Sequence, residues 1–464
     1  MPDGFVNPST GDPKSDAVRR GAISNEQRLV ALGEAVDQHS GISRRGGERQ
    51  SKKAHKRRRV AVISVIVCLA LIAGLIGGGY LYSRWRWDRI PRIVVHHLKY
   101  PVPGEPFNIL AIGSDSRTGL SKQLAAQTGA TTVGGQRSDV VKIIHVDPIN
   151  RVVQIVSIPR DTVVTLLANQ GLYGKYNRIN VNIGSGPSLL AKTITANFGI
   201  QINHVIEVSF GGLVNASEAV GGVYLDFAHP LRDVESGLDV AHLGCQNING
   251  TEALAFTRSR HLLYSLSNTK WPTNGVALYR AGDLSTLAAE GWDYDGTSDY
   301  GRITRQNAFL EAMFTKVKGS LSNPIKMNNF LSNLPKGVAI DSTFTFNEMI
   351  GLALKFHGMS SSAIQTFTLP TIPGYLGSSD VLYIQQPAAQ QLFVQVFGKE
   401  LTAPTNPPPV NSAGDTPMPP VIAVTTTTTH LPTSTAKGHM TTTTTPVTTT
   451  TINPYPYNPV PCNP

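Results

Sequence analysis

The stretch VVKIIHVDPINRVVQIVSIPRD, residues 140–161, contains two apolar runs on either side of a turn. Both runs are rich in β-branched residues, and DPIN between them combines an Asp-Pro pair with an Asn two residues later. Residues of this kind favour turns, so the stretch predicts a β-hairpin. The second run ends in Arg160 and Asp161. Charged side chains are rarely buried unless they are paired or bind something, so the end of this strand is a candidate site.

Strand and helix patterns alternate on both sides of the hairpin. In residues 299–319 the apolar side chains recur at helical spacing, which predicts the clearest helix of the chain. Mixed strands and helices with an antiparallel hairpin predict an α/β fold, an α/β/α sandwich with a central mixed β-sheet. The other segments with a clear pattern are strands at 107–117 and 204–210, helices at 188–198 and 249–261, and a strand followed by a helix at 380–398.

A separate apolar segment precedes this region. Residues 60–82 contain no charge, and 23 helical residues span about 30 Å of hydrocarbon. A buried core helix or a signal sequence would fit less well, so we predict a single transmembrane helix. Residues 44–59 before it hold nine Lys or Arg, which predicts a cytoplasmic N-terminus and places everything after Tyr82 outside. Residues 1–59 are polar and basic, and we expect them to be a disordered cytoplasmic tail that could touch anionic lipid.

The remaining chain divides by composition into a juxtamembrane linker (83–104), an outer domain (105–400) and a Thr/Pro-rich disordered tail (401–464). The segment between residues 100 and 400 holds 22 Lys or Arg and 22 Asp or Glu, so the basic excess belongs to the N-terminal end and does not predict nucleic-acid binding. Cys245 and Cys462 could pair outside the membrane or stay reduced. Whether the tail is glycosylated is open.

Several arginines and carboxylates follow or precede the predicted strands and helices. If neighbouring strands bring these ends together, they form a pocket of guanidinium groups with a few carboxylates, which suits a diphosphate and Mg²⁺. A structural ion-pair network is the alternative. No P-loop, GxSxG, HExxH or CxxC pattern is present. The arginines and carboxylates at these strand and helix ends are Arg117, Arg137, Arg160, Arg178, Arg258, Arg260, Arg302 and Arg305, with Asp115, Asp139, Asp161 and Asp299.

Five ordered motifs together resemble the LytR-CpsA-Psr (LCP) family. The resemblance covers about residues 105–320 and extends more loosely to 400. It implies an LCP fold and a membrane-anchored phosphotransferase that moves a glycopolymer from a polyprenyl-diphosphate carrier onto peptidoglycan as a phosphodiester. The two tails resemble those of actinobacterial members, which implies arabinogalactan as the polymer. The alternatives are a lipid diphosphate phosphatase and a non-catalytic regulator that binds lipid diphosphate. The motifs are NILAIGSDSR, RSDVVKIIHVDP with VVQIVSIPRDT, NRIN, ING with ALAFTRSRH, and DYGRITRQ.

The resemblance also implies roles for individual residues. Asp115 and Asp139 would hold Mg²⁺, or Mn²⁺ in its place, and an apolar channel would take the prenyl chain. Arg160, Asp161 and Asp139 would be catalytic, with Asp161 either orienting Arg160 or acting on the attacking hydroxyl. The partners would be the lipid-linked glycopolymer, peptidoglycan and membrane lipid, and no nucleic acid. The diphosphate would be bound by Arg137, Arg160, Arg178, Arg258, Arg260 and Arg302, with Gln306 lining the pocket and Asp299 orienting the arginines.

Two features depart from the family pattern. Arg178 stands where many members have Lys, which keeps the charge. The loop from Leu262 to Ser298 is long, and we expect it to shape the acceptor side of the pocket.

Overall fold

The computed structural model describes residues 29–30, 34, 61–117, 120–122, 124, 138–320, 324–356, 358–359, 363–399, 401 and 457–463. The chain separates into two compact units, Met1–Tyr82 and Ser83–Pro464. The apolar segment forms one helix, Ala61–Trp87, which is long and apolar enough to cross a membrane. It extends five residues past the predicted end at Tyr82, so the first residues of the predicted linker are helical.

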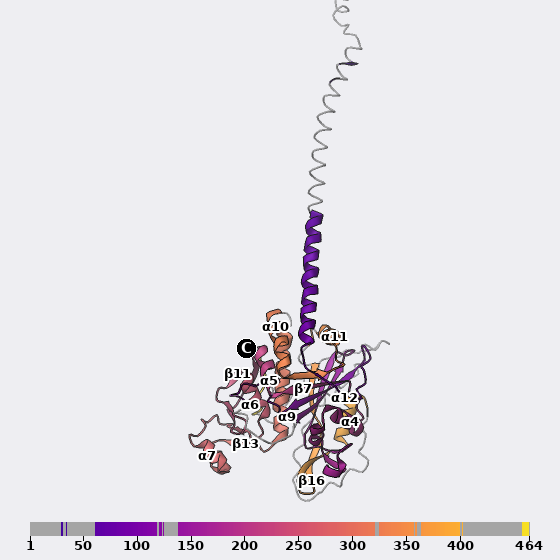
Figure 1. The fold of residues 1–464 in the computed structure, drawn as a ribbon. Helices are drawn as coiled ribbons and strands as arrows, with labels where there is room; N and C mark the ends of the chain where they lie inside the picture. Colours follow the sequence, from indigo (N-terminus) through magenta and orange to yellow (C-terminus); the bar gives the residue numbers. More distant parts are fainter. Residues whose placement is uncertain are drawn as a thin grey trace, which may run out of the picture. The chain divides into compact units, whose positions relative to one another are not determined.

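The second unit is built on a seven-stranded mixed sheet (Figure 1). The predicted hairpin is confirmed: its two strands pair antiparallel, with Val141 opposite Ile158 and Asp147 opposite Val152. Three of the pairs in this sheet are parallel and three are antiparallel. The strands in spatial order are β1 (Arg92–Ile93), β14 (Val338–Asp341), β7 (His204–Ser209), β2 (Phe107–Ser114), β3 (Ser138–Asp147), β4 (Val152–Ile158) and β15 (Ile364–Thr368).

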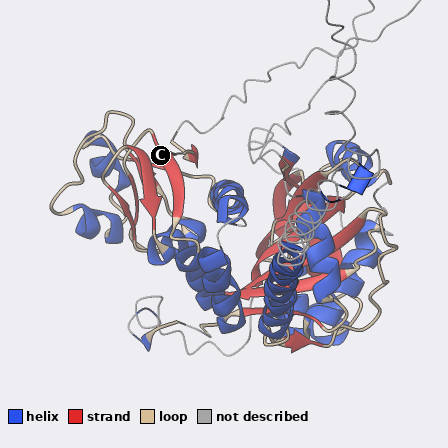
Figure 2. Cartoon of the chain, turned by 90° about the horizontal axis from the view of Figure 1, so that it is seen from above, coloured by secondary structure: helices blue, strands red, loops and turns tan. Residues whose placement is uncertain are grey.

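Helices cover both faces of this sheet, which confirms the predicted sandwich (Figure 2). On one face Leu110 and Ile143 pack against Leu190 of α4 (Pro187–Phe198) and Phe393 of α12 (Ala388–Phe397). On the other face, Ile155 and Ile364 pack against side chains of α9 (Asp299–Ser320) and α11 (Phe346–Phe356). Alternate residues of a strand point to opposite faces, so each central strand supplies both cores. The helix α10 (Pro324–Asn333) contacts α9.

A further hydrophobic core, which includes Phe227 and Phe256, lies around two smaller sheets. Asn249 and Glu252 form a reciprocal capping box at the start of α6 (Gly250–Arg258), with N–H···O distances of 3.0 and 2.8 Å, so this helix begins where the sequence predicts. The sheets are β11 (Gly244–Ile248), β8 (Val223–Phe227) and β18 (Val460–Pro461), and β10 (Leu238–Val240), β9 (Leu231–Asp233), β12 (Leu263–Tyr264) and β13 (Asp293–Tyr294).

Short elements complete the unit. They are β5 (Val163–Thr165), α3 (Gln170–Tyr173), β6 (Tyr176–Arg178), a 3₁₀ helix at Ile179–Ser185, α5 (Phe210–Ala219), α7 (Gly275–Arg280), α8 (Leu284–Ala289), a 3₁₀ helix at Leu334–Lys336, β16 (Thr371–Leu376) and β17 (Ser379–Ile384).

The C-terminal end differs from the prediction of one tail over residues 401–464. Residues 457–463 belong to the folded domain: β18 pairs antiparallel with β8, and Cys462 forms a disulfide with Cys245. Tyr457 is buried and stacks on Tyr264, with ring centroids 3.9 Å apart. These last residues supply an aromatic side chain and strand-edge hydrogen bonds, which a run of Thr and Pro lacks.

The disulfide predicts a large effect of reduction on stability. It joins positions 217 residues apart, and closing so long a loop restricts the unfolded chain. We expect Cys462→Ser to lower the free energy of unfolding by about 2–4 kcal/mol, measured by denaturant unfolding of the full chain. Cys68→Ser is the matched control, because Cys68 is unpaired and exposed. Equal stability of wild type with and without dithiothreitol would contradict the prediction.

Candidate active site

The ends of three strands meet at one edge of the central sheet. Ser114 at the end of β2 pairs with Ser138 at the start of β3, and Ile158 at the end of β4 pairs with Val141. Asp115, Arg160 and Asp161 leave the sheet at this same edge, as the sequence predicts for their backbone positions. Arg137 lies outside the described residues, and so does the side chain of Asp139. Their roles stay predictions.

A first charged group lies just after β4. The Arg160 Nε is 3.3 Å from Asp161 Oδ2, and Arg178 Nη1 is 3.5 Å from Asp161 Oδ1. The pairing of β5 with β6 brings Arg178 to this place, because Val163 lies opposite Arg178. All three charged side chains are partly exposed. Asp161 therefore sits between two arginines, which fits the orienting role among the two roles considered for it.

A second charged group lies on the first turns of α9. Oδ1 of Asp299 accepts from Arg260 Nη2 at 3.1 Å and from Arg302 Nη2 at 2.6 Å. Gln306, one turn further along the helix, donates from Nε2 to the carbonyl oxygen of Thr257 at 3.1 Å. The guanidinium of Arg258 lies 4.9 Å from the ring centre of Phe210. Residues spaced three and four apart share one helix face, so α9 presents Asp299, Arg302 and Gln306 together.

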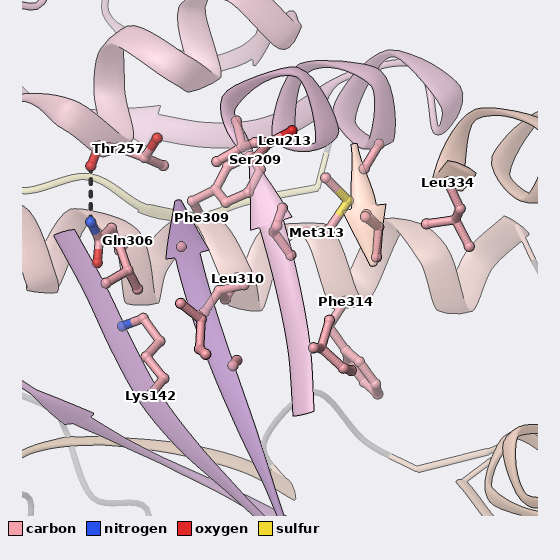
Figure 3. Close-up of a pocket in the computed structure, with 18 of the residues that line it drawn as sticks. Lys142, Ser209, Leu213, Thr257, Gln306, Phe309, Leu310, Met313, Phe314 and Leu334 are labelled. Atoms are coloured by element: carbon pink, nitrogen blue, oxygen red, sulfur yellow. Dashed lines mark hydrogen bonds between the residues drawn. The ribbon is translucent and has the colours of Figure 1, made fainter. Parts of the chain in front are cut away.

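A cavity of about 1360 Å³ runs along this face of α9 (Figure 3). Its polar end is lined by Arg258, Arg260, Arg302 and Gln306. The lining then becomes apolar along α9, and the strands β2, β3 and β7 form the opposite wall. Arg160, Asp161 and Arg178 do not line it, so the predicted site residues that the structure describes fall into two groups. The apolar lining from α9 is Phe309, Leu310, Met313, Phe314 and Val317.

Asp233 is a site residue that the sequence analysis missed. It is fully buried, and its carboxylate accepts five hydrogen bonds of 2.7–3.0 Å. Burial raises the pKa of this carboxyl, but the hydrogen bonds outweigh burial and leave the pKa below its usual range. Asp233 therefore fixes the backbone directly after α6, which ends at Arg258, in the loop that carries Arg260. The donors are the amides of Glu235, Ser236, Arg260 and His261 and the hydroxyl of Ser259.

Arg305, one of the arginines named in the sequence analysis, binds the backbone of the loop after α6 and does not line the cavity. Arg305 and Asp295 are both fully buried and are paired at 3.2 Å. Arg305 also donates to the carbonyl oxygen of Ser259 at 2.9 Å and to Asn458 Oδ1 at 3.2 Å. The C-terminal segment is thus linked through Arg305 to the loop between Arg258 and Arg260.

A family comparison matches most of the second unit. The model of the LytR_cpsA_psr family matches residues 94–265 and 292–397, which together are more than half of the chain. The chain belongs to the LytR_cpsA_psr family. This LytR_cpsA_psr chain leaves residues 266–291 outside the match, and they contain α7 and α8. Tyr279 of α7 lines the cavity, so part of the long loop lies at it, and the expected role of this loop on the acceptor side stays a prediction.

Curated relatives and solved structures of the family are also similar. The chain is 28% identical over 357 residues to the probable cell wall biosynthesis protein LcpB of Corynebacterium glutamicum, covering 74% of this chain and 72% of that protein. It is 25% identical to the polyisoprenyl-teichoic acid–peptidoglycan teichoic acid transferase TagV of Bacillus subtilis, covering 72% of this chain and 76% of that protein. The LytR-Csp2A-Psr enzyme from Actinomyces oris is a structural neighbour with a TM-score of 0.49 and 18% identity, covering 66% of this chain and 96% of that chain.

The predicted metal ligands fit the coordination chemistry of Mg²⁺ or Mn²⁺. These ions take oxygen ligands, and Mg²⁺ is commonly held by one or two carboxylates and substrate phosphates. Asp115 directly follows β2, and Asp139 is the second residue of β3, beside the pair that Ser114 makes with Ser138. In the described part of the chain no three His, Cys, Asp or Glu side chains are grouped as a metal site, so the fit rests on this pair of backbone positions.

The lowered pKa of Asp233 predicts how its contribution to stability depends on pH. A carboxyl whose pKa is lowered by folding stabilises the fold above its unfolded pKa, and this contribution is lost as pH falls through the folded pKa. We expect Asp233→Asn to lower the free energy of unfolding by about 2–3 kcal/mol at pH 7 and by less below the folded pKa, where wild type has also lost the charge. Denaturant unfolding between pH 3 and pH 8 measures this.

Asp239→Asn is the control, since Asp239 is exposed and pairs with Arg232 at the surface. A loss from Asp233→Asn that stays constant across this pH range would contradict the assignment.

Proposed function

We propose that this chain is a membrane-anchored phosphotransferase that moves a glycopolymer from a polyprenyl-diphosphate carrier onto peptidoglycan. One observation carries the proposal: a single cavity has three arginines at one end, where Asp233 and Glu235 also line it, and a mostly apolar lining along the rest of its length. A ligand that fits such a cavity has an anionic head and a long hydrocarbon chain. Residues 302 and 317 both line it, and 15 helical residues span about 22 Å.

The polar end is suited to hold a diphosphate. Arginine forks match phosphate oxygens in two-point contacts. Arg302 is 2% exposed and lines the cavity, and Asp299 holds it and Arg260 in place. Buried Arg260 Nε has no hydrogen-bond partner among the described residues, so this guanidinium keeps unused donor capacity.

The reaction is a displacement at the sugar-linked phosphorus. A hydroxyl oxygen of peptidoglycan forms a bond to this phosphorus, and the bond from the phosphorus to the bridging oxygen of the diphosphate breaks. The products are a phosphodiester and polyprenyl monophosphate, and the hydroxyl proton leaves to solvent or a base. The diphosphate is already activated, so no nucleotide is needed. Positioning and charge neutralisation do most of the work in phosphoryl transfer, and arginines supply both.

The strand-end residues would act on the same head group. Asp115 and Asp139 would hold Mg²⁺ or Mn²⁺, which neutralises charge on the phosphate oxygens when it is bound. Arg160 and Arg178, with Asp161 between them, would bind anionic groups at the sheet edge. Asp161 would orient Arg160, since it contacts this guanidinium directly.

The apolar end supports a carrier lipid that enters from a membrane. Ser83, Trp87 and Ile90 line the cavity; Ser83 and Trp87 belong to the last turns of the helix Ala61–Trp87, and Ile90 follows it. Trp87 packs edge-on against Phe344, with ring centroids 5.6 Å apart. The basic flank before the helix supports a cytoplasmic N-terminus with the second unit outside.

We propose arabinogalactan as the polymer and peptidoglycan as the acceptor. The relative TagV is named for the transfer of teichoic acid to peptidoglycan, which supports an acceptor of that kind. The relative LcpB is named for cell wall biosynthesis and comes from Corynebacterium. The basic and Thr/Pro-rich ends that resemble actinobacterial members support the choice of polymer.

A transfer assay with a matched arginine pair tests the proposal. The full chain is incubated with a polyprenyl-diphosphate arabinogalactan fragment, Mg²⁺ and peptidoglycan fragments, and linked product is measured by mass spectrometry. We expect Arg302→Gln to lower the rate about 100-fold or more, because it removes charge stabilisation at the diphosphate. Arg280→Gln, at an exposed position in the last turn of α7, should keep the wild-type rate.

The alternatives give different results in this assay. Release of free polymer phosphate without a linked product would indicate a phosphatase. Tight lipid binding without any product would contradict the enzyme assignment and indicate a binding protein.

A further inference from the structure

A buried lysine lies on the cavity face of the central sheet. Val140, Lys142, Ile144 and Val146 alternate along β3 and all line the cavity, and three of these four are apolar. Lys142 is 3% exposed. A lysine in such surroundings is costly unless it is paired or binds something.

The contacts of Lys142 leave part of its donor capacity unused. Its Nζ donates to Ser157 Oγ at 2.6 Å and to Asn307 Oδ1 at 2.7 Å. An ammonium group has three donors, so two neutral partners use two of them and the third remains for a ligand in the cavity. Neither partner carries a charge, and the ammonium therefore has no counter-ion in direct contact among the described residues.

Lys142 lies where the lining of the cavity changes from polar to apolar. Figure 3 shows Lys142 reaching from β3 toward α9, near Gln306 and Leu310. On α9 the lining residues change from Arg302 and Gln306 to Leu310 at successive turns. Lys142 is therefore the innermost cation on the polar side of this change.

The charge of Lys142 responds to what the cavity holds. Burial and, to a smaller extent, the positive charge of Arg302 lower its pKa from 10.5 to about 7, and the negative charge of Asp299 opposes both effects. Arg258 and Arg260 line the same cavity, and so do the acidic residues Asp233 and Glu235. Near neutral pH, much of the lysine is thus uncharged, and an anion beside it would favour the ammonium form.

We propose that Lys142 is a phosphate ligand at the inner end of the site, where its ammonium contacts the phosphate that is bonded to the prenyl chain. This inference rests on the proposed function, since it takes a prenyl diphosphate as the occupant of the cavity. Lys142 then fixes where the head group ends and the hydrocarbon begins. Binding is accompanied by the transfer of a proton from solvent to Nζ, and no bond of the lipid breaks.

Titration calorimetry with two matched lipids tests this role. The probes are geranylgeranyl monophosphate and geranylgeraniol, which share the chain and differ in the phosphate, and the protein is the full chain in nanodiscs. Titrations at pH 7.5 in two buffers of different ionisation enthalpy give the affinity and the number of protons taken up. We expect Lys142→Met to weaken binding of the phosphate about 10- to 100-fold, to leave binding of the alcohol unchanged and to reduce proton uptake.

Two further variants keep the test decisive. Lys316→Met is the control, because Lys316 lies on the same helix outside the cavity lining, with its Nζ 4.1 Å from the ring centre of Tyr224. Lys142→Gln removes the charge but keeps an amide that can bond Ser157, so it serves if the Met variant unfolds. It should show the same selective loss.

The outcomes separate this inference from the proposed function. A Lys142→Met protein that binds the phosphate as wild type does, with the same proton uptake, would overturn the role of Lys142 alone. Equal loss for the alcohol and the phosphate would also overturn it, since that result indicates a packing role. A wild-type chain that does not prefer the phosphate to the alcohol would overturn both the inference and the proposed function.

Discussion

The site depends on one carboxylate oxygen that two guanidinium groups share. Oδ1 of Asp299 accepts from Arg302 on its own helix and from Arg260 on a loop 39 residues earlier. Arg302 is almost fully buried, and a buried charge that loses its partner is strongly destabilising. The pairing therefore holds α9 against the loop after α6. Asp233 fixes the backbone of this loop, and Arg305 fixes it from the other side.

The helix α9, held in place by this pairing, contributes both polar and apolar side chains to the lining of the cavity. The first turns of α9 are held by charge pairs, and the later turns contribute Leu310 and Phe314 to the apolar core with β4 and β15. A single helix thus carries both Arg302, at the polar end of the cavity, and the apolar side chains that line the cavity further along. The strand end with Arg160 and Asp161 is a second charged group at the edge of the same sheet. Tyr279, from a segment outside the family match, lies at the polar end, where an acceptor would approach.

The sequence predicts the features that depend on local patterns. The hairpin follows from β-branched runs around DPIN, and α9 from its apolar spacing. The sequence indicates that Cys245 and Cys462 could pair but does not decide whether they do, because they lie 217 residues apart across a Thr/Pro segment. The role of Asp233 depends on a loop 26–28 residues further on, which no short pattern reveals. The sequence shows Lys142 as one charged residue in an apolar strand. Its burial beside Ser157 and Asn307 becomes visible only in the structure.

Photo-crosslinking tests most directly the central claim that one cavity holds both the head group and the chain. A polyprenyl diphosphate with a benzophenone at the end of its chain is bound to the full chain in nanodiscs, irradiated, and mapped by mass spectrometry. The account predicts crosslinks to the cavity lining, on Met313 and Val317 of α9 and Met349 of α11, and competition by inorganic diphosphate at the polar end. Crosslinks confined to the opposite face of the sheet, on α4 and α12, would contradict it.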